Sequence, residues 1–142
     1  MNNNLINKKV AIVWAKPFIG NRGVSALAYS TLYLLKKISE DEGWKLDITF
    51  LGNPEGSINI NGRIINFKGQ KEINSWKSLF LKLINPSLFL NYFKFDYILD
   101  AGYGDAYSDI YEKQTFFGLN FSKKFFNLIN TRQLMLPQTI GP

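Results

Sequence analysis

The stretch KVAIVWAKPFIGNRGVSALAYSTLYLLKK, residues 9–37, decides the fold because its apolar pattern changes part-way along. Residues 9–15 are a continuous apolar run between two lysines, which is typical of a strand buried in a parallel sheet. A loop follows at residues 17–23. From Val24 onward, apolar residues recur at helical spacing, in a stripe made up of Leu27, Leu34, Leu35 and Ile38. This order predicts a unit of strand, helix and parallel strand.

The rest of the chain extends this unit. Gly43 ends the helix, and residues 46–51 (LDITFL) predict the second strand. Asn61-Gly62 lies between two short apolar segments, which predicts a β-hairpin with a type I′ turn. We also expect, further along, a helix at 73–93 broken near Asn85-Pro86, a strand at 96–100, a helix at 113–130 that contains Gly118, and a last strand at 134–136.

The expected fold class is therefore α/β, a Rossmann-like parallel sheet with flanking helices. This domain is expected to span residues 9–142, after a flexible N-terminus at residues 1–8. A doubly wound domain usually closes with a helix after its last strand, whereas here the last strand is followed only by the start of a loop. We therefore expect this domain to be the front part of a longer protein, with a C-terminal domain absent.

Composition limits the chemistry that this chain can supply. Its 142 residues are enough for one domain with a core. Cysteine and histidine are both absent, which excludes disulfides, thiolate zinc sites, a cysteine nucleophile and an imidazole base. We expect no metal and no cofactor. The net charge of +6 comes from scattered basic residues, so a nucleic-acid partner is not expected. No apolar run reaches the roughly twenty residues of a transmembrane helix.

Three polar, glycine-rich loops follow predicted strands, at residues 16–25, 100–111 and 137–142. Ligands of open parallel sheets bind beyond the carboxyl ends of the strands, where such loops meet. The three loops are therefore expected to lie together at one edge of the sheet. The third loop, PQTIGP, contributes Gln138 and Gly141 as candidate binding residues.

The first loop holds four candidate binding residues, Gly20, Asn21, Arg22 and Gly23. Its glycines let the backbone approach a ligand, and the following helix directs its first N–H groups to the same space. An equally good interpretation is an ordinary turn, with Ser25 or Asn21 capping the helix. The pattern is not G-x-G-x-x-G, so a dinucleotide site is not supported.

The second loop places three carboxylates, Asp100, Asp105 and Asp109, at the end of one strand. Carboxylates there can bind sugar hydroxyls, ligate a divalent cation or transfer protons. Gly102 and Gly104 leave room for Asp105 to approach a ligand. The alternative is that Asp100 is a buried hydrogen-bonded residue and that Asp105 or Asp109 caps the next helix. Three carboxylates in one loop favour a functional role.

In this order, three segments resemble motifs of the polysaccharide pyruvyl transferase family. GNRGVSALAYSTLYLL, residues 20–35, resembles the family's N-terminal motif, where Asn-x-Gly precedes a helix that begins with small residues and Ala-Leu. DYILDAGYGDAYSDIY, residues 96–111, resembles its Asp-rich segment, with matches at Gly104, Asp105, Asp109 and Tyr111 and a replacement of glycine by Tyr103. LMLPQTIGP, residues 134–142, resembles its Leu-Pro-Gln-x-Ile-Gly-Pro loop. Together with the strand at residue 10, these matches span the chain from residue 10 to its last residue.

The resemblance implies the N-terminal domain of a two-domain enzyme like the GT-B glycosyltransferases. Members transfer a pyruvyl group from phosphoenolpyruvate to a sugar in exopolysaccharide biosynthesis, and some act on lipid-linked precursors at the inner membrane. A cytoplasmic enzyme, peripheral to that membrane, is therefore expected. Its partners would be phosphoenolpyruvate, a glycan or lipid-linked sugar acceptor, and the C-terminal domain. We expect this half to bind the acceptor, with Asp105 as the catalytic residue and Tyr103, Gly104 and Asp109 beside it.

Two departures from the family pattern bear on these expectations. Many members carry an acidic residue near the position of Val24, and the family's histidine and most of its phosphate-binding basic residues fall in the second half. Two other interpretations stay open. The chain could be the N-terminal domain of a GT-B glycosyltransferase with a nucleotide-sugar donor, or a non-catalytic sugar-binding fragment. Residues 76–95 mix aromatic residues with lysines, which fits packing within or between domains better than docking on a membrane.

Overall fold

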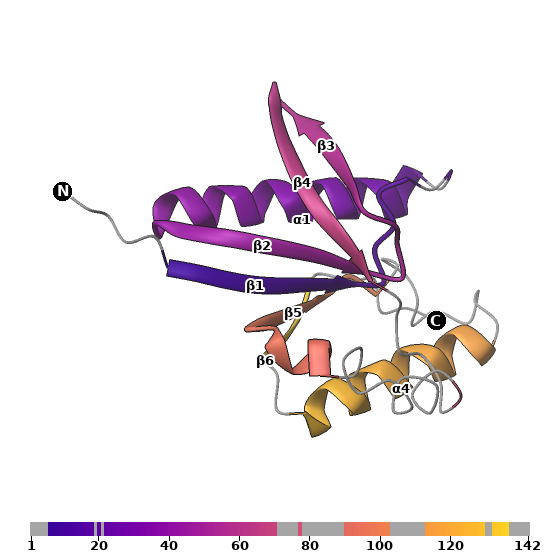
Figure 1. Ribbon diagram of the computed structural model, residues 1–142. Coiled ribbons are helices and arrows are strands. Elements are labelled where there is room, and N and C mark those ends of the chain that lie inside the picture. The colour runs from indigo at the N-terminus through magenta and orange to yellow at the C-terminus, as the bar shows by residue number, and fades with distance from the viewer. Residues whose placement is uncertain are drawn as a thin grey trace.

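The computed structural model describes residues 6–18, 20, 22–70, 77, 90–102, 113–129 and 132–136. In this part of the chain, six strands form one sheet with helices packed against it (Figure 1). The elements, in chain order, are β1 (Ile6–Val13), α1 (Arg22–Asp41), β2 (Trp44–Leu51), β3 (Gly56–Ile60), β4 (Arg63–Gln70), the short 3-10 helix η1 (Asn91–Lys94), β5 (Tyr97–Asp100), α4 (Lys113–Leu128) and β6 (Arg132–Met135).

The sheet is mainly parallel, in the spatial order β3-β4-β2-β1-β5-β6. Only β3 runs antiparallel, as the first strand of the β3–β4 hairpin. β1 lies in the centre, where it pairs with β2 on one side and β5 on the other. When the parallel strands are numbered along the chain, their order is 3-2-1-4-5, as in a doubly wound sheet. The predicted α/β class with a parallel sheet is confirmed.

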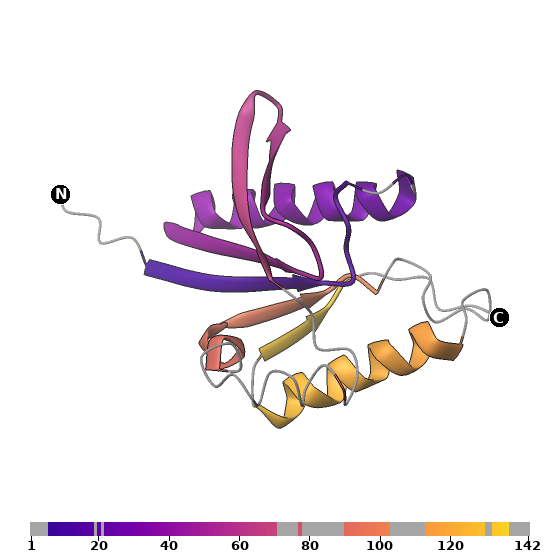
Figure 2. The ribbon, with the colours of Figure 1, turned by 45° about the vertical axis from the view of Figure 1, so that its right-hand side comes forward.

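Helices cover both faces of this sheet. α1 lies on one face and α4 with η1 on the other, as the two ribbon views show (Figures 1 and 2). Alternate residues of β1 therefore enter two different cores. Val10 and Ile12 belong to the cluster on the α1 side, and Ala11 and Val13 to the cluster on the α4 side. A strand buried on both faces reads as a continuous apolar run, which is why residues 9–15 were recognisable.

The boundaries of several elements differ from the expected ones. β1 begins at Ile6, so it includes residues that were expected in the flexible N-terminus, and it pairs from there with β2, which begins at Trp44. The first four residues of β1 are exposed or half-buried, so they carry no apolar pattern. β6 begins at Arg132, before its predicted start. Of the helix expected at 73–93, the structure describes Lys77 and Leu90, both helical, and the start of η1.

The predicted apolar stripe of α1 was wrong at two of its four positions. Leu34 and Ile38 are exposed, and the buried face consists of Val24, Ala28, Thr31, Leu32, Leu35 and Ser39. Small residues on this face let the helix lie close to the sheet. Leu34 and Ile38 instead line an apolar hollow of about 310 Å³, whose other walls include Tyr97 of β5 and Leu134 of β6. A stripe chosen by hydropathy alone includes these leucine and isoleucine side chains and leaves out the small residues that contact the sheet.

The hairpin turn is confirmed at Asn61-Gly62. Their φ values, 52° and 79°, are both positive, as a type I′ turn requires. The hairpin rises beside α1 (Figure 1), and the side chains of Ile58, Ile65 and Phe67 fix it to the core.

Candidate functional site

The carboxyl ends of β1, β5 and β6 lie at one edge of the sheet because these three strands are neighbours and run parallel. Hydrogen bonds between backbones continue past the strand ends. The N–H of Ala101 donates to Val13 O at 3.0 Å, and the N–H of Leu136 donates to Asp100 O at 2.9 Å. From β1 the chain passes to α1 on one face, and from β5 to α4 on the other (Figure 2). The carboxyl ends of the paired strands β1 and β5 thus form the switch point, which is where open α/β sheets bind ligands.

The chain leaves β1 through a constrained turn. Trp14 is buried and has a φ of 58°, a conformation that non-glycine residues rarely adopt. The Asn53 side-chain amide donates to Ala15 O at 2.9 Å, which ties this turn to the residues after β2. The hydroxyl of Ser25, in the first turn of α1, donates to Lys16 O at 3.4 Å. Unfavourable backbone conformations of this kind cost about 1–3 kcal/mol and concentrate at functional sites.

The chain leaves β5 through a buried carboxylate. Asp100 is 0% exposed, and its Oδ1 accepts a hydrogen bond of 2.9 Å from the N–H of Gly102. Its Oδ2 lies 3.0 Å from Nζ of Lys123 on α4, so the ion pair joins the end of β5 to the helix that covers it. Gly102 has a φ of 50°, which favours glycine. The alternative interpretation of Asp100, as a buried hydrogen-bonded residue, is confirmed.

The candidate binding residues that the structure describes come after β1 and β5, the two strands of the switch point. Gly20, Arg22 and Gly23 are exposed in the connection from β1 to α1, and Gly102 directly follows β5. Arg22 is the first residue of α1, so the N-terminus of this helix opens toward the carboxyl edge. The other candidates lie outside the described residues: Asn21, Tyr103, Gly104, Asp105, Asp109, Gln138 and Gly141.

Three residues of this edge were not recognised from the sequence: Trp14, Asn53 and Lys123. Nothing in the residue type of Trp14 indicates a positive φ, because tryptophan has no preference for it. Asn53 follows a glycine and precedes a proline, a pattern of turn residues that predicts a loop but not its partner. Lys123 interrupts the phenylalanine-rich segment 113–130, which is the one available sign that it has a buried partner.

The described part of this edge offers groups that bind polar or anionic ligands. It supplies a helix N-terminus together with the basic side chains of Lys16 and Arg22, a combination that suits anions or hydroxyl groups. Over the residues described, no three His, Cys, Asp or Glu side chains gather as metal ligands would. Asp100 is occupied by Lys123 and Gly102, so its role here is to hold the exit of β5 in place.

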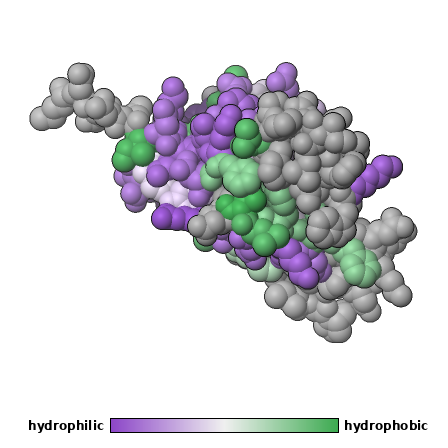
Figure 3. Space-filling view, turned by 60° about the horizontal axis from the view of Figure 1, so that its bottom comes forward, coloured by the Kyte–Doolittle hydropathy of each residue, from purple (hydrophilic) through white to green (hydrophobic). Residues whose placement is uncertain are grey.

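Hydrophobic side chains also reach the surface on the α4 side. Viewed obliquely from below relative to Figure 1, the molecule shows a hydrophobic area flanked by hydrophilic residues (Figure 3). Exposed apolar residues of η1, α4 and β6 include Phe93, Leu128 and Met135. Tyr92, the neighbour of Phe93, is instead buried against Phe125 and Phe126. None of the helices that the structure describes is long and apolar enough to cross a membrane.

Comparisons with protein-family models, with curated proteins and with solved structures found no match.

Proposed function

We propose that this chain is the N-terminal, acceptor-binding domain of a polysaccharide pyruvyl transferase. The observation that carries the proposal is the adjacency of β1, β5 and β6. Each of the three segments that resemble family motifs follows or contains one of these strands: residues 20–35 follow β1, residues 96–111 contain β5, and residues 134–142 begin in β6. Parallel neighbouring strands direct all three segments toward the same edge, which is what a shared binding site needs.

The proposed reaction moves a pyruvyl group from phosphoenolpyruvate to two hydroxyls of one sugar. The methylene carbon of the donor takes a proton while one hydroxyl attacks C2 and loses its own proton. The second hydroxyl then displaces phosphate from C2 and gives up its proton to the departing phosphate, which closes a cyclic ketal. These steps require an acid, a base and a cationic cradle for the phosphate and carboxylate. We assign the base to Asp105, at the position that matches the family's acidic residue.

The shortage of cations at this edge supports the assignment to the acceptor. Among the described residues that follow the strand ends there, Lys16 and Arg22 are the basic ones, and Lys123 is already paired with Asp100. A doubly charged phosphate and a carboxylate need more positive charge than this. In the proposal, a second domain arranged as in the GT-B glycosyltransferases binds the donor. The enzyme is cytoplasmic, with peripheral contact to the inner membrane where the acceptor is lipid-linked.

Phosphate release tests the proposal directly. The two-domain protein, given phosphoenolpyruvate and a glycan acceptor, is expected to release phosphate, whereas the 142-residue chain alone is expected to release none. Consumption of a nucleotide sugar instead of phosphoenolpyruvate would identify a GT-B glycosyltransferase. If the two-domain protein used neither donor but bound glycans, the chain would be a non-catalytic sugar-binding module.

Asp105→Asn tests the assigned base in the same assay. The substitution keeps the size and one acceptor oxygen, so we expect turnover to fall at least about tenfold, or about 1.4 kcal/mol, with little change in stability. Asp109→Asn, at the second candidate carboxylate of the same loop, is the comparison. Full turnover of Asp105→Asn together with loss of turnover in Asp109→Asn would move the assignment to Asp109.

A further inference from the structure

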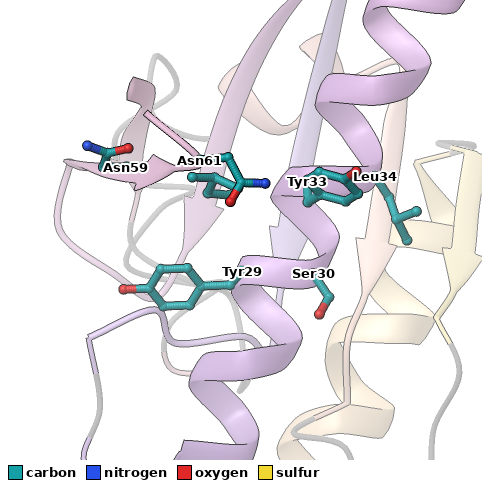
Figure 4. A pocket seen from close by; sticks show the side chains of 7 residues that line it. Tyr29, Ser30, Tyr33, Leu34, Asn59 and Asn61 are labelled. Atoms are coloured by element: carbon teal, nitrogen blue, oxygen red, sulfur yellow. The ribbon is translucent and has the colours of Figure 1, made fainter. Parts of the chain in front are cut away.

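A second hollow, with a mainly apolar lining and a few polar groups, lies away from the carboxyl edge, between α1 and the β3–β4 hairpin. Its volume is about 500 Å³, and its walls are Tyr29, Ser30, Tyr33, Leu34, Asn59, Ile60 and Asn61 (Figure 4). Tyr29 extends from α1 on the side where Asn59 and Asn61 of the hairpin lie. A hollow of this volume, lined by aromatic rings and a few polar groups, lies in the size range of small-molecule sites. It is open on its outer side, so a ligand bound there stays partly in solvent.

The two tyrosines present accessible rings at this hollow. Tyr29 and Tyr33 are one helical turn apart on α1, so their side chains emerge on the same face. They remain 39% and 50% exposed. Within the described part of the chain, neither ring stacks on another aromatic ring and neither hydroxyl forms a hydrogen bond. Both rings and hydroxyls can therefore contact a ligand.

The asparagines on the opposite wall are held by a rigid hairpin. All five residues of β3 pair with β4, and Ile58 and Ile65 are buried in the core. Arg63 forms an ion pair with Glu40 of α1, which fixes the hairpin to the helix a second time. As far as the structure describes the chain, the side-chain amides of Asn59 and Asn61 make no hydrogen bond. Because the backbone of this wall is already held in place, binding costs less conformational entropy than it would on a flexible loop.

The composition of the walls selects the class of ligand. No wall residue carries a charge, which disfavours phosphates, nucleotides and other anions. Amide and hydroxyl groups each offer both a donor and an acceptor, as do the hydroxyl groups of a sugar. The faces of tyrosine rings are apolar, as are the C–H faces of a pyranose ring. We propose that this hollow binds a neutral carbohydrate, as a subsite separate from the carboxyl edge. This binding does not depend on pyruvyl transfer.

Binding of neutral glycans to the purified chain tests the proposal. The probes are an array of neutral oligosaccharides built from hexoses, deoxyhexoses and N-acetylhexosamines, with hits titrated by NMR, and adenosine and uridine as planar aromatic competitors. We expect at least one oligosaccharide to bind with a Kd of about 1 mM or lower. Saturation-transfer signals should come from its ring C–H protons.

Three variants locate the binding. Tyr33→Ala removes one ring and is expected to weaken binding about tenfold or more. Asn61→Gly removes the amide but keeps a residue that accepts positive φ, so the turn is retained and a loss of affinity reports the amide itself. Phe117→Ala, at an exposed position of α4, is the control and should leave the affinity unchanged.

Several results would overturn the proposal. One is an array without any binding glycan. Another is glycan binding that Tyr33→Ala and Asn61→Gly leave intact, because the site would then lie elsewhere. A third is binding of the nucleosides alone at these residues. Since the readout is affinity rather than phosphate release, failure here is distinguishable from failure of the proposed enzyme activity.

Discussion

Removing Lys123 from the ion pair with Asp100 should destabilise the protein strongly. In Lys123→Met the aliphatic stem is replaced at similar length, but the carboxylate of Asp100, which is 0% exposed, loses its cation. Breaking a buried pair from one side costs about 3–5 kcal/mol because a buried charge is left uncompensated. Two features place this case near the lower limit. The Lys123 side chain is 20% exposed, and the N–H of Gly102 still donates to Asp100.

We therefore expect a loss of about 3 kcal/mol in the free energy of unfolding, or about 10 °C in Tm for a domain of this size. Asp100→Asn should cost less, about 1–2 kcal/mol, because asparagine still accepts from Gly102 and the Lys123 ammonium can reach solvent. The double variant Asp100→Asn/Lys123→Met should cost less than the sum of the two single ones, since the residues are in direct contact.

Urea unfolding followed by far-ultraviolet circular dichroism measures these differences. The control is Lys124→Met, which removes the same charge from the exposed neighbouring position and should change stability by no more than about 0.5 kcal/mol. If Lys123→Met cost no more than Lys124→Met, the ion pair would contribute nothing, and the account of how β5 is held to α4 would be refuted.

Three further predictions concern packing and loop contacts, and all are measured by the same unfolding assay. Gly69→Ala should cost about 3 kcal/mol or more, because the added Cβ would strike the backbone of residues 53–55, whereas Gly20→Ala, with no atom within 4 Å of its added Cβ, should be neutral; equal costs would contradict this. Asn53→Ala should cost about 1–2 kcal/mol, and Asn53→Asp should cost more, because a carboxylate would face the Ala15 carbonyl without a proton to donate. The reverse order would show that this hydrogen bond is not important. Phe126→Ala should cost about 3–5 kcal/mol because it leaves a cavity in the core, whereas Phe117, which is 69% exposed, should tolerate alanine. A small cost at Phe126 would mean that the core on the α4 side can collapse around the cavity.

The sheet could be predicted from the sequence because its signals are local. Residues 9–15 read as a buried strand since both faces of β1 are covered, and Asn61-Gly62 identified the hairpin since few other dipeptides accept two positive φ values. The start of β1 was missed because its exposed residues carry no pattern. The apolar stripe read from the sequence included Leu34 and Ile38, which are exposed, because the sequence does not show which side of a helix contacts the sheet.

The sequence predicted the edge of the sheet at which the candidate site lies, but not the contacts between its residues. Its place followed from the rule that loops after parallel strands meet at one edge. The pairing of Asp100 with Lys123 could not be predicted, because it joins a strand to a helix that is distant in sequence. The positive φ of Trp14 likewise depends on tertiary contacts rather than on residue type. Asp105, the assigned base, lies outside the described residues, and its role stays a prediction.

The central position of β1 also has a consequence for synthesis of the chain. One side of β1 can pair with β2, the next strand to emerge from the ribosome, while the other side must wait for β5, which comes after β3 and β4. Until then, the Val10–Val13 edge presents unpaired backbone groups beside apolar side chains, the arrangement that promotes association between incomplete chains. Slow translation between residues 51 and 97 should therefore lower the soluble yield, and a chaperone that shields strand edges should restore it.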